Sequence, residues 1–178
     1  MRSEPVAVLA MMGLLATVGL LAARCGSRAP GTQPPPPVAD ASRVDMCTIL
    51  TDQELTGLGI DRSTRKPENV LGVVGCGWLG KPFTLRLERD KETIASYVAR
   101  RTDPSFVTFA RNTVHGRAGI QIQLRRSGDQ CDQSMDGGAV SLTVGVAASF
   151  SLDPQPFDAC AEALRIAQII EPRLPKSG

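Results

Sequence analysis

Four cysteines in the downstream part of the chain have the right residue type for either disulfide bonds or a metal site, and their spacing distinguishes the two. Cys47, Cys76, Cys131 and Cys160 contain no CxxC pair, and the chain has a single histidine, His115. Zinc sites need closely spaced Cys or His ligands, and a catalytic thiolate needs a neighbouring base. We therefore predict two structural disulfides, no metal site and no catalytic cysteine.

Three pairings of these cysteines are compatible with the sequence. Sequential pairing, Cys47 with Cys76 and Cys131 with Cys160, closes two loops of similar length. The crossed pairings close longer loops and gain only about 1 kcal/mol more per bridge in the chain-entropy model. Loop length therefore does not choose between them. We favour sequential pairing because each bridge would join a predicted helix to a predicted strand.

Carboxylates are the other groups with catalytic potential. Glu88, Asp90 and Glu92 alternate along one segment and could meet a distant acid to form the paired carboxylates of a hydrolase. No serine lies in a GxSxG nucleophile motif. The segment DQSMDGG at residues 132–138 lacks the alternating oxygen ligands and closing glutamate of a calcium loop, and we predict a turn there. These observations favour a protein that is not an enzyme and needs no cofactor.

Three segments alternate strictly between apolar and polar residues, at 83–88, 120–125 and 140–146. A period of two is typical of a strand with one buried and one exposed face. A fourth strand is predicted around residues 76–79, joined to the first segment through residues 80–82 as a hairpin. Strands with one polar face do not suit a parallel sheet covered on both sides, so we predict an antiparallel sheet.

Helices are predicted at residues 45–58, at 90–100, and from about 153–156 to Pro172. Thr51 and Glu54 have capping-box spacing, and Asp90 is the expected N-cap of the second helix. The third helix carries an apolar stripe at helical spacing, made of Phe157, Cys160, Ala161, Leu164 and Ala167. The sequence thus predicts an α+β fold, an antiparallel β-sheet with helices packed on one face and two disulfides.

The polar positions of the predicted strands form the candidate binding face. Its hydrogen-bonding and charged residues are Arg86, Gln121, Gln123, Arg125 and Thr143. Such a face could recognise a glycan, a peptide or a partner domain. The alternative interpretation is the solvated outer face of a two-layer domain. The formal net charge of +2 gives no broad positive surface for nucleic acid.

The N-terminal residues have the composition of an export signal. Residues 6–23 carry no charge, a stretch longer than the apolar part of a secretory signal, roughly 7–15 residues, and just long enough for a spanning helix of ~18 residues. Three outcomes are open: lipidation of Cys25 after cleavage before it, secretion after cleavage behind Ala23, or an uncleaved anchor. Arg24 stands where a lipobox has a small residue. We assign residues 1–25 as a signal peptide or membrane anchor.

Residues 26–44 separate this segment from the folded part. They include four consecutive prolines, 34–37, which favour an extended polyproline II conformation and prevent packing into a core. We therefore predict a proline-rich linker over 26–44 and a single folded domain over 45–175.

Several short motifs of the predicted domain occur in the order of one known family. DMCTILTDQEL at residues 45–55 resembles a "DPC-x-LL-T-x-x-E-L" opening, and CGW at 76–78 resembles a "C-x-W" strand. GRA at 116–118 is similar to a "G-R-P-A" segment, and Cys131 and Cys160 stand where that family has its second cysteine pair. Met46 replaces the usual proline, and Arg24 departs from the lipobox. The chain thus resembles the DUF3558 family of actinobacterial envelope lipoproteins, whose function is unknown.

Taken together, these features predict a domain on the extracytoplasmic face of the plasma membrane, or secreted from it. The resemblance implies tethering through the N-terminal segment or a lipid. The expected function is non-enzymatic binding of a small ligand or an envelope protein. The alternative is a hydrolase or transferase that acts on wall or lipid substrates with a carboxylate pair.

Overall fold

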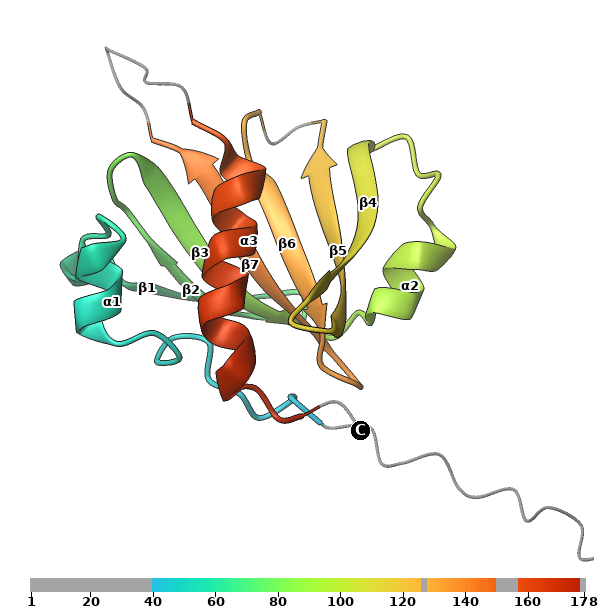
Figure 1. Cartoon of the computed structure of the whole chain (residues 1–178), viewed down its shortest axis with the longest axis horizontal. Helices are drawn as coiled ribbons and strands as arrows, with labels where there is room; N and C mark the ends of the chain where they lie inside the picture. The colour runs from blue at the N-terminus through green and yellow to red at the C-terminus, as the bar shows by residue number, and fades with distance from the viewer. Residues whose placement is uncertain (1–39, 126–127, 150–156, 177–178) are drawn as a thin grey trace, which may run out of the picture. The chain divides into compact units, whose positions relative to one another are not determined.

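The computed structural model of the chain describes residues 40–125, 128–149 and 157–176 (Figure 1). Seven strands form one sheet in the order β1-β2-β3-β7-β6-β5-β4, and every neighbouring pair is antiparallel. The strands are β1 (Lys66–Val70), β2 (Val73–Trp78), β3 (Phe83–Asp90), β4 (Phe106–Val114), β5 (Arg117–Leu124), β6 (Cys131–Asp136) and β7 (Ser141–Ala148). The helices are α1 (Asp52–Gly57), α2 (Ile94–Ala99) and α3 (Ala159–Ile170), with two short 3-10 turns, η1 (Arg62–Thr64) and η2 (Glu171–Arg173). The predicted α+β class with an antiparallel sheet is confirmed.

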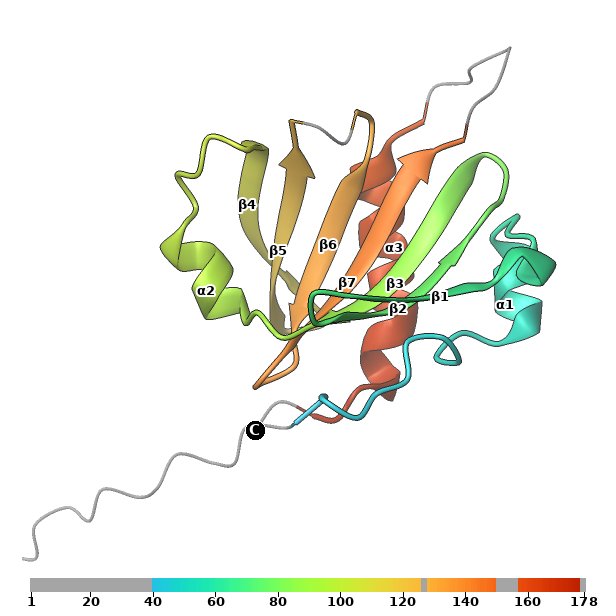
Figure 2. The same ribbon diagram turned by 180° about the vertical axis from the view of Figure 1, so that it is seen from behind.

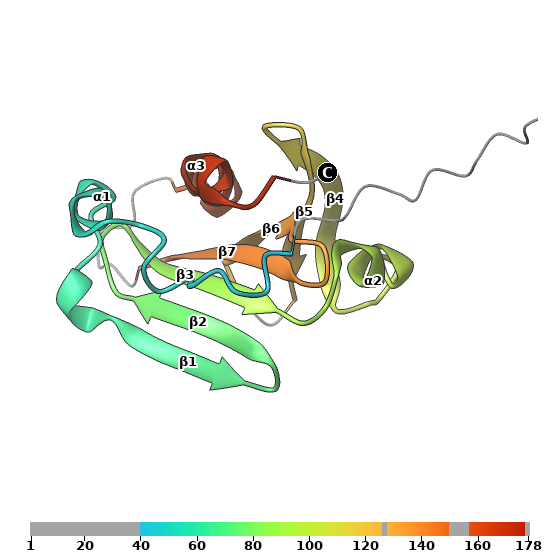
Figure 3. The same cartoon turned by 90° about the horizontal axis from the view of Figure 1, so that it is seen from below.

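The helices lie in two layers about the sheet. Figure 3 shows α3 and α1 on one side of the sheet and α2 on the other, next to β4 and β5, and Figure 2 shows the sheet from the side opposite α3. We call these two surfaces of the sheet the α3 face and the α2 face. The hydrophobic core lies on the α3 face, where buried residues of α3 meet alternate residues of the central strands, among them Ile166, Ile170, Leu85, Leu87, Val144 and Val146.

The first two helices are shorter than predicted because a later residue caps each one. The capping box of Thr51 and Glu54 is present, and it starts α1 at Asp52. Residues 45–50 form turns instead of helix. In α2 the N-cap is Thr93, whose hydroxyl accepts a hydrogen bond from the Ser96 amide. Asp90, the expected cap, is instead the last residue of β3.

The third helix begins at Ala159, with Asp158 as its N-cap. The expected start, within residues 153–156, lies outside the described residues. An N-cap aspartate satisfies the free amides of the first turn, and Asp158 accepts hydrogen bonds from the amides of Cys160 and Ala161. The α-helix ends at Ile170, and Pro172 falls in the following 3-10 turn.

The predicted turn at residues 132–138 is wrong over most of its length, because Cys131–Asp136 is β6. Its polar residues hide the strand pattern: Gln133 and Ser134 are both buried. Burial is tolerated since both are hydrogen-bonded. Gln133 bonds Asn112, and Ser134 bonds Thr143 across the ladder. β1 and β4 were not predicted either, because their residues do not alternate strictly between apolar and polar.

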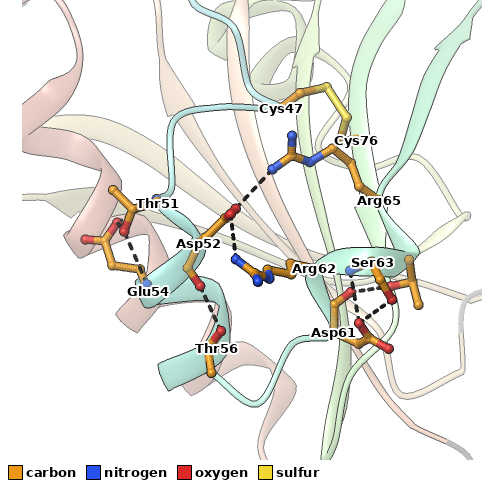
Figure 4. Close-up of polar contacts among 11 residues, drawn as sticks. Cys47, Thr51, Asp52, Glu54, Thr56, Asp61, Arg62, Ser63, Arg65 and Cys76 are labelled. Carbon is orange, nitrogen blue, oxygen red and sulfur yellow. Dashed lines mark hydrogen bonds and ion pairs between the residues drawn. A yellow bond between two sulfur atoms is a disulfide. The ribbon is translucent and has the colours of Figure 1, made fainter.

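Both predicted disulfides are present in the sequential pairing. Cys47 is bonded to Cys76, and Cys131 to Cys160, with S–S distances of 2.06 and 2.05 Å. The second bridge joins a strand to a helix as predicted, while the first joins β2 to the turn that precedes α1, because Cys47 lies before that helix. Figure 4 shows the first bridge beside α1, where Asp52 contacts Arg62 and Arg65.

The folded part begins a few residues earlier than Asp45. Ala41, placed in the linker by the sequence, is fully buried, and its amide donates to the Gly137 carbonyl over 3.0 Å. The rest of the linker, the apolar segment 6–23 and Cys25 lie outside the described residues. In the part of the chain that the structure describes, no helix has the length and apolar character to cross a membrane.

Candidate functional site

Three rows of side chains cross the α2 face at the centre of the sheet. Strand alternation places every second residue of β3, β7 and β6 on this face, and the register aligns them. The rows, each written in the order β3, β7, β6, are Arg86–Gly145–Asp132, Glu88–Thr143–Ser134 and Asp90–Ser141–Asp136. Charged and hydroxyl groups from three strands therefore gather on one surface.

The first row holds an ion pair across a glycine. An Arg86 Nη2 lies 3.5 Å from Asp132 Oδ1, and Nη1 lies 3.3 Å from Glu88 Oε1. Gly145, on the strand between Arg86 and Asp132, leaves room for this contact. A Cβ atom at Gly145 would lie 2.8 Å from Asp132 Oδ1 and 3.2 Å from Arg86 Nε. The Arg86 guanidinium thus contacts two carboxylates, and the missing side chain of Gly145 leaves space for Arg86 and Asp132 to meet.

Both carboxylates are poorly solvated. Burial raises the pKa of Glu88, and the nearby Arg86 charge opposes this rise without cancelling it. Burial also raises the pKa of Asp132, against the lowering effects of Arg86 and of a hydrogen bond from Gln130. Desolvation disfavours the charged form of a carboxylate. The pair therefore has more negative charge than Arg86 compensates.

A pocket of about 80 Å³ lies over these rows. We call it the acidic pocket. Its polar wall consists of three carboxylates and two hydroxyls, from Glu88, Asp90, Asp132, Ser134 and Thr143, and its apolar wall consists of Tyr97, Phe106, Ile122 and Leu124.

A wider hollow of about 730 Å³ adjoins the acidic pocket. The two share Tyr97, Phe106 and Leu124, and we call the wider one the aromatic hollow. Its far side is lined by Arg100, Asp103, Pro104, Ser105 and Arg125. Together they form one recess that is acidic and narrow at one end, and wide and mostly apolar at the other.

Helix α2 supplies the side chain that joins the two. The Tyr97 hydroxyl donates to Asp90 Oδ2 over 2.9 Å, which fixes the helix to the end of β3. Burial, followed by this hydrogen bond, raises the pKa of Tyr97 above its ordinary value. The Arg100 guanidinium lies 4.7 Å from the centre of the Tyr97 ring, a cation–π distance.

The five residues of the predicted binding face do not share one face. Arg86 and Thr143 lie on the α2 face; Thr143 lines the acidic pocket, and Arg86 lies beside it in contact with Glu88 and Asp132. Gln121 lies on the α3 face, where its Nε2 donates to the Cys160 carbonyl over 2.9 Å. Gln123 lies on the same side and accepts from Thr108. Arg125 follows β5 and lines the aromatic hollow. Alternation shows which residues of one strand share a side, but not how the sides of different strands correspond.

Of the three acids singled out in the sequence, the structure brings two together. Glu88 and Asp90 line the acidic pocket, and the distant acid that joins them is Asp132. Glu92 points elsewhere and forms an ion pair with Arg100. The sequence signal for Asp132 was weak, because it stands in the polar segment interpreted as a turn.

Three other candidate residues have structural roles. Trp78 is 3% exposed and belongs to the core. His115 has a positive φ of 48° in the turn between β4 and β5, and its Nδ1 lies 3.6 Å from Glu171 Oε2. Arg117, in the GRA segment, is buried and bonds Glu171 and the Asp136 and Pro175 carbonyls. Within the described residues, no group of three His, Cys, Asp or Glu side chains is arranged to hold a metal ion.

Comparison with known proteins gives one match. A family model described as "Protein of unknown function (DUF3558)" matches residues 20–173. The comparisons with curated proteins and with solved structures found no match.

Proposed function

The chain belongs to the DUF3558 family, and from this membership and the geometry above we propose that it is a non-enzymatic binding module of the cell envelope. In this proposal the N-terminal segment or a lipid on Cys25 tethers the domain outside the membrane. The acidic pocket and the aromatic hollow then receive a small ligand or part of an envelope protein.

The observation that carries the proposal is the recess itself. Binding sites are typically concave and mostly apolar, with a few fixed polar groups that orient the ligand. Here the apolar part is formed by Tyr97, Phe106 and Leu124, and the polar part by carboxylates that Arg86 and Tyr97 hold in place. The fixed groups come from β3, β6 and α2, so the site is built by the fold rather than by one loop.

The location rests on three features. The two disulfides are compatible with an oxidising compartment, where such bonds persist. The uncharged segment 6–23 supports export. The actinobacterial lipoprotein character of the family resemblance supports the same location.

A photo-crosslinking experiment in intact cells tests the binding proposal. Phe106 lines both parts of the recess, so benzoylphenylalanine at this position of the full-length chain should form an adduct with the occupant. The control is the same substitution at Thr56, an exposed residue of α1 on the other side of the sheet. An adduct at position 106 alone supports the proposal. No adduct at 106, or equal adducts at both positions, contradicts it.

The location is tested by the intact mass of the non-reduced chain from the membrane fraction. The mass distinguishes an acylated Cys25, a shortened chain and an uncut N-terminus. Loss of hydrogen from four cysteines is expected in each case. Free thiols at Cys47, Cys76, Cys131 and Cys160 in the native chain would contradict an extracytoplasmic location.

A second candidate function is a hydrolase or transferase for wall or lipid substrates. One observation favours it: Glu88 and Asp132 line the same pocket, and burial raises both pKa values, as in the acid of a catalytic carboxylate pair. Arg86, which contacts both groups, favours binding over proton transfer. Turnover of a wall glycan that is abolished by both Glu88→Gln and Asp132→Asn would identify the enzyme; an adduct at position 106 without turnover identifies the binding module.

A further inference from the structure

We propose that the acidic pocket binds an alkylammonium group, with the ammonium among the carboxylates and the alkyl stem directed into the aromatic hollow. This inference rests on the proposed binding function and adds the chemical class of the ligand. It follows from the charge of the pocket, its size, its apolar wall and the two buried hydroxyls that line it.

The charge of the pocket favours a cation. Glu88, Asp90 and Asp132 line it, and no lysine or arginine is among the described residues of its lining. Among the described residues, Arg86 is the one guanidinium in contact with Glu88 and Asp132. Arg100 and Arg125 line the adjoining aromatic hollow, so the acidic pocket itself is lined by three carboxylates. Glu88 and Asp132 have side chains only 13% and 17% exposed. A poorly hydrated, undercompensated carboxylate gains most from a cation that approaches without a full water shell.

The size of the pocket favours a compact cation. A volume of about 80 Å³ has room for only a few heavy atoms, since a water molecule in the liquid occupies about 30 Å³. A primary ammonium with one or two methylenes is of this size. A trimethylammonium head is bulkier and has no N–H donors, so it would satisfy none of the oxygen acceptors.

The apolar wall provides for the stem of the ligand. Tyr97, Phe106 and Leu124 are shared by the acidic pocket and the aromatic hollow. A chain that leaves the pocket must therefore pass along two aromatic rings and a leucine before it reaches the wider opening. Burial of each methylene against such a wall strengthens binding by about fourfold, which gives an alkyl stem an advantage over a bare cation.

The hydroxyl groups add acceptors for the ammonium N–H donors. Ser134 and Thr143 are 2% and 7% exposed and bond each other over 2.8 Å, so each oxygen keeps a further lone pair. Ser141 lies two residues from Thr143 on the same face and is fully buried. Its hydroxyl has no hydrogen-bond partner within the described residues. Ser141 is not among the residues that line the acidic pocket, so the hydroxyl acceptors for the ammonium are those of Ser134 and Thr143.

The test uses four probes of similar length: butylammonium, butanol, butyrate and butyltrimethylammonium. The full-length chain, placed in lipid nanodiscs, is labelled at isoleucine and leucine methyl groups, and each probe is titrated while the methyl resonances are followed. Ile122 and Leu124 line the pocket, so their resonances should shift with butylammonium and stay unchanged with the other three probes. An ammonium that forms charge-assisted hydrogen bonds should bind about tenfold or more tightly than the alcohol.

Two variants test whether the change in the methyl resonances depends on the carboxylates of Glu88 and Asp132. Asp132→Asn and, independently, Glu88→Gln should weaken butylammonium binding by about tenfold. The matched control is Asp52→Asn, a 55% exposed aspartate of α1 on the other side of the sheet, which should leave the binding unchanged. The unperturbed methyl spectrum of each variant confirms that the fold is retained, and two separate variants protect the test against misfolding of one.

The outcomes separate this inference from the proposed function. If butyrate or butanol shifts the resonances of Ile122 and Leu124 as strongly as butylammonium, or does so while butylammonium does not, the ligand class is wrong and the binding function stands. If butylammonium binds equally to wild type, Asp132→Asn and Glu88→Gln, the ammonium does not use the carboxylates and the inference fails. If no probe moves these resonances and position 106 forms no adduct in cells, both proposals fail. A lysine-containing dipeptide that competes with butylammonium would indicate a protein as the source of the group.

Discussion

Arg86 and Asp132 belong to strands that do not pair with each other, and their side chains meet over Gly145 of the strand between them. The contact spans β7 from β3 to β6. It places the only guanidinium of the first row between two desolvated carboxylates, Glu88 and Asp132. The geometry of the acidic pocket therefore depends on the absence of a side chain at one position of the central strand.

Replacing Gly145 by alanine should disrupt this arrangement. The new Cβ would lie 2.8 Å from Asp132 Oδ1 and 3.2 Å from two nitrogens of Arg86, so the ion pair must shift apart. We expect a loss of about 1 kcal/mol or less in the free energy of unfolding, measured by urea denaturation, because the atoms that must move are the ends of two side chains and alanine is favoured over glycine inside a strand.

Gly57→Ala is the matched control for this substitution. Nothing lies within 4 Å of a Cβ at Gly57, which is in α1. Alanine in a helix is favoured over glycine by about 1 kcal/mol, so this variant should be at least as stable as the wild type. If both variants unfold at the same denaturant concentration, the gap at Gly145 is not needed for the Arg86–Asp132 contact.

The stability of the domain should depend on pH through Asp132. Burial raises the pKa of Asp132 in the folded state, so the folded chain takes up this proton more readily than the unfolded chain. The favourable contribution of Asp132 to the free energy of unfolding is fully present below its unfolded pKa of about 3.9. This contribution is lost as the pH rises through the folded pKa. The Asp132→Asn variant has no carboxyl group to titrate at this position. Its free energy of unfolding, compared with that of the wild type, should therefore increase from pH 4 to pH 7.

Asp61→Asn provides a control of opposite sign. Hydrogen bonds from Ser63 lower the pKa of Asp61, so its contribution is present above the unfolded pKa and lost on acidification. Unfolding curves of both variants and the wild type between pH 3 and pH 7 measure the two trends. A relative stability of Asp132→Asn that does not change with pH would show that folding does not raise the pKa of Asp132.

Much of the fold was predictable because single strands and caps carry local signals. The alternation at 83–88, 120–125 and 140–146 located β3, β5 and β7. The capping box of Thr51 and Glu54 is present, although the predicted helix began at residue 45 and α1 begins at Asp52. The site was not predictable, since its polar wall depends on which strands are neighbours. Asp132 and Ser134 lie in a strand whose polar residues are buried by mutual hydrogen bonds, and no periodicity reveals such a strand.

The contact between Glu54 and Arg173 should stabilise the domain near neutral pH and lose this effect over a defined acidic range. Arg173, from η2, bonds both Glu54 and the Ile49 carbonyl, and so joins the C-terminal segment to α1. The hydrogen bond from Arg173, with others from Thr51, lowers the pKa of Glu54 to about 2. Because the folded pKa is lowered, the ionised Glu54 carboxylate adds to the free energy of unfolding above its unfolded pKa of 4.5. This stabilisation is lost as the pH falls toward 2.

Glu54→Gln isolates this effect because glutamine also completes a capping box. The variant should be less stable than the wild type at pH 6, and the difference should shrink between pH 4.5 and pH 2 as the wild-type carboxylate is protonated. Both side chains are about one-third exposed, so we expect a small effect, on the order of 1 kcal/mol or less. Arg173→Gln should also be less stable than the wild type at pH 6, and part of this difference should disappear between pH 4.5 and pH 2, since Thr51 still lowers the pKa of Glu54. A difference between Arg173→Gln and the wild type that does not change with pH would contradict the contact.

Tyr97→Phe should loosen α2 without altering the sheet. The substitution removes the hydroxyl that donates to Asp90 Oδ2 over 2.9 Å and leaves the ring in the wall of both the acidic pocket and the aromatic hollow. A hydrogen bond to a charged group is worth about 1.5–3 kcal/mol, and partial exposure of the pair places the expected loss at the lower end. Hydrogen exchange measures where the loss falls: the amides of Tyr97 to Arg100 should exchange faster, while those of β3 and β7 should not. Faster exchange throughout the sheet would show instead that Tyr97 supports the whole domain, and unchanged exchange in α2 would show that the contact with Asp90 does not hold the helix in place.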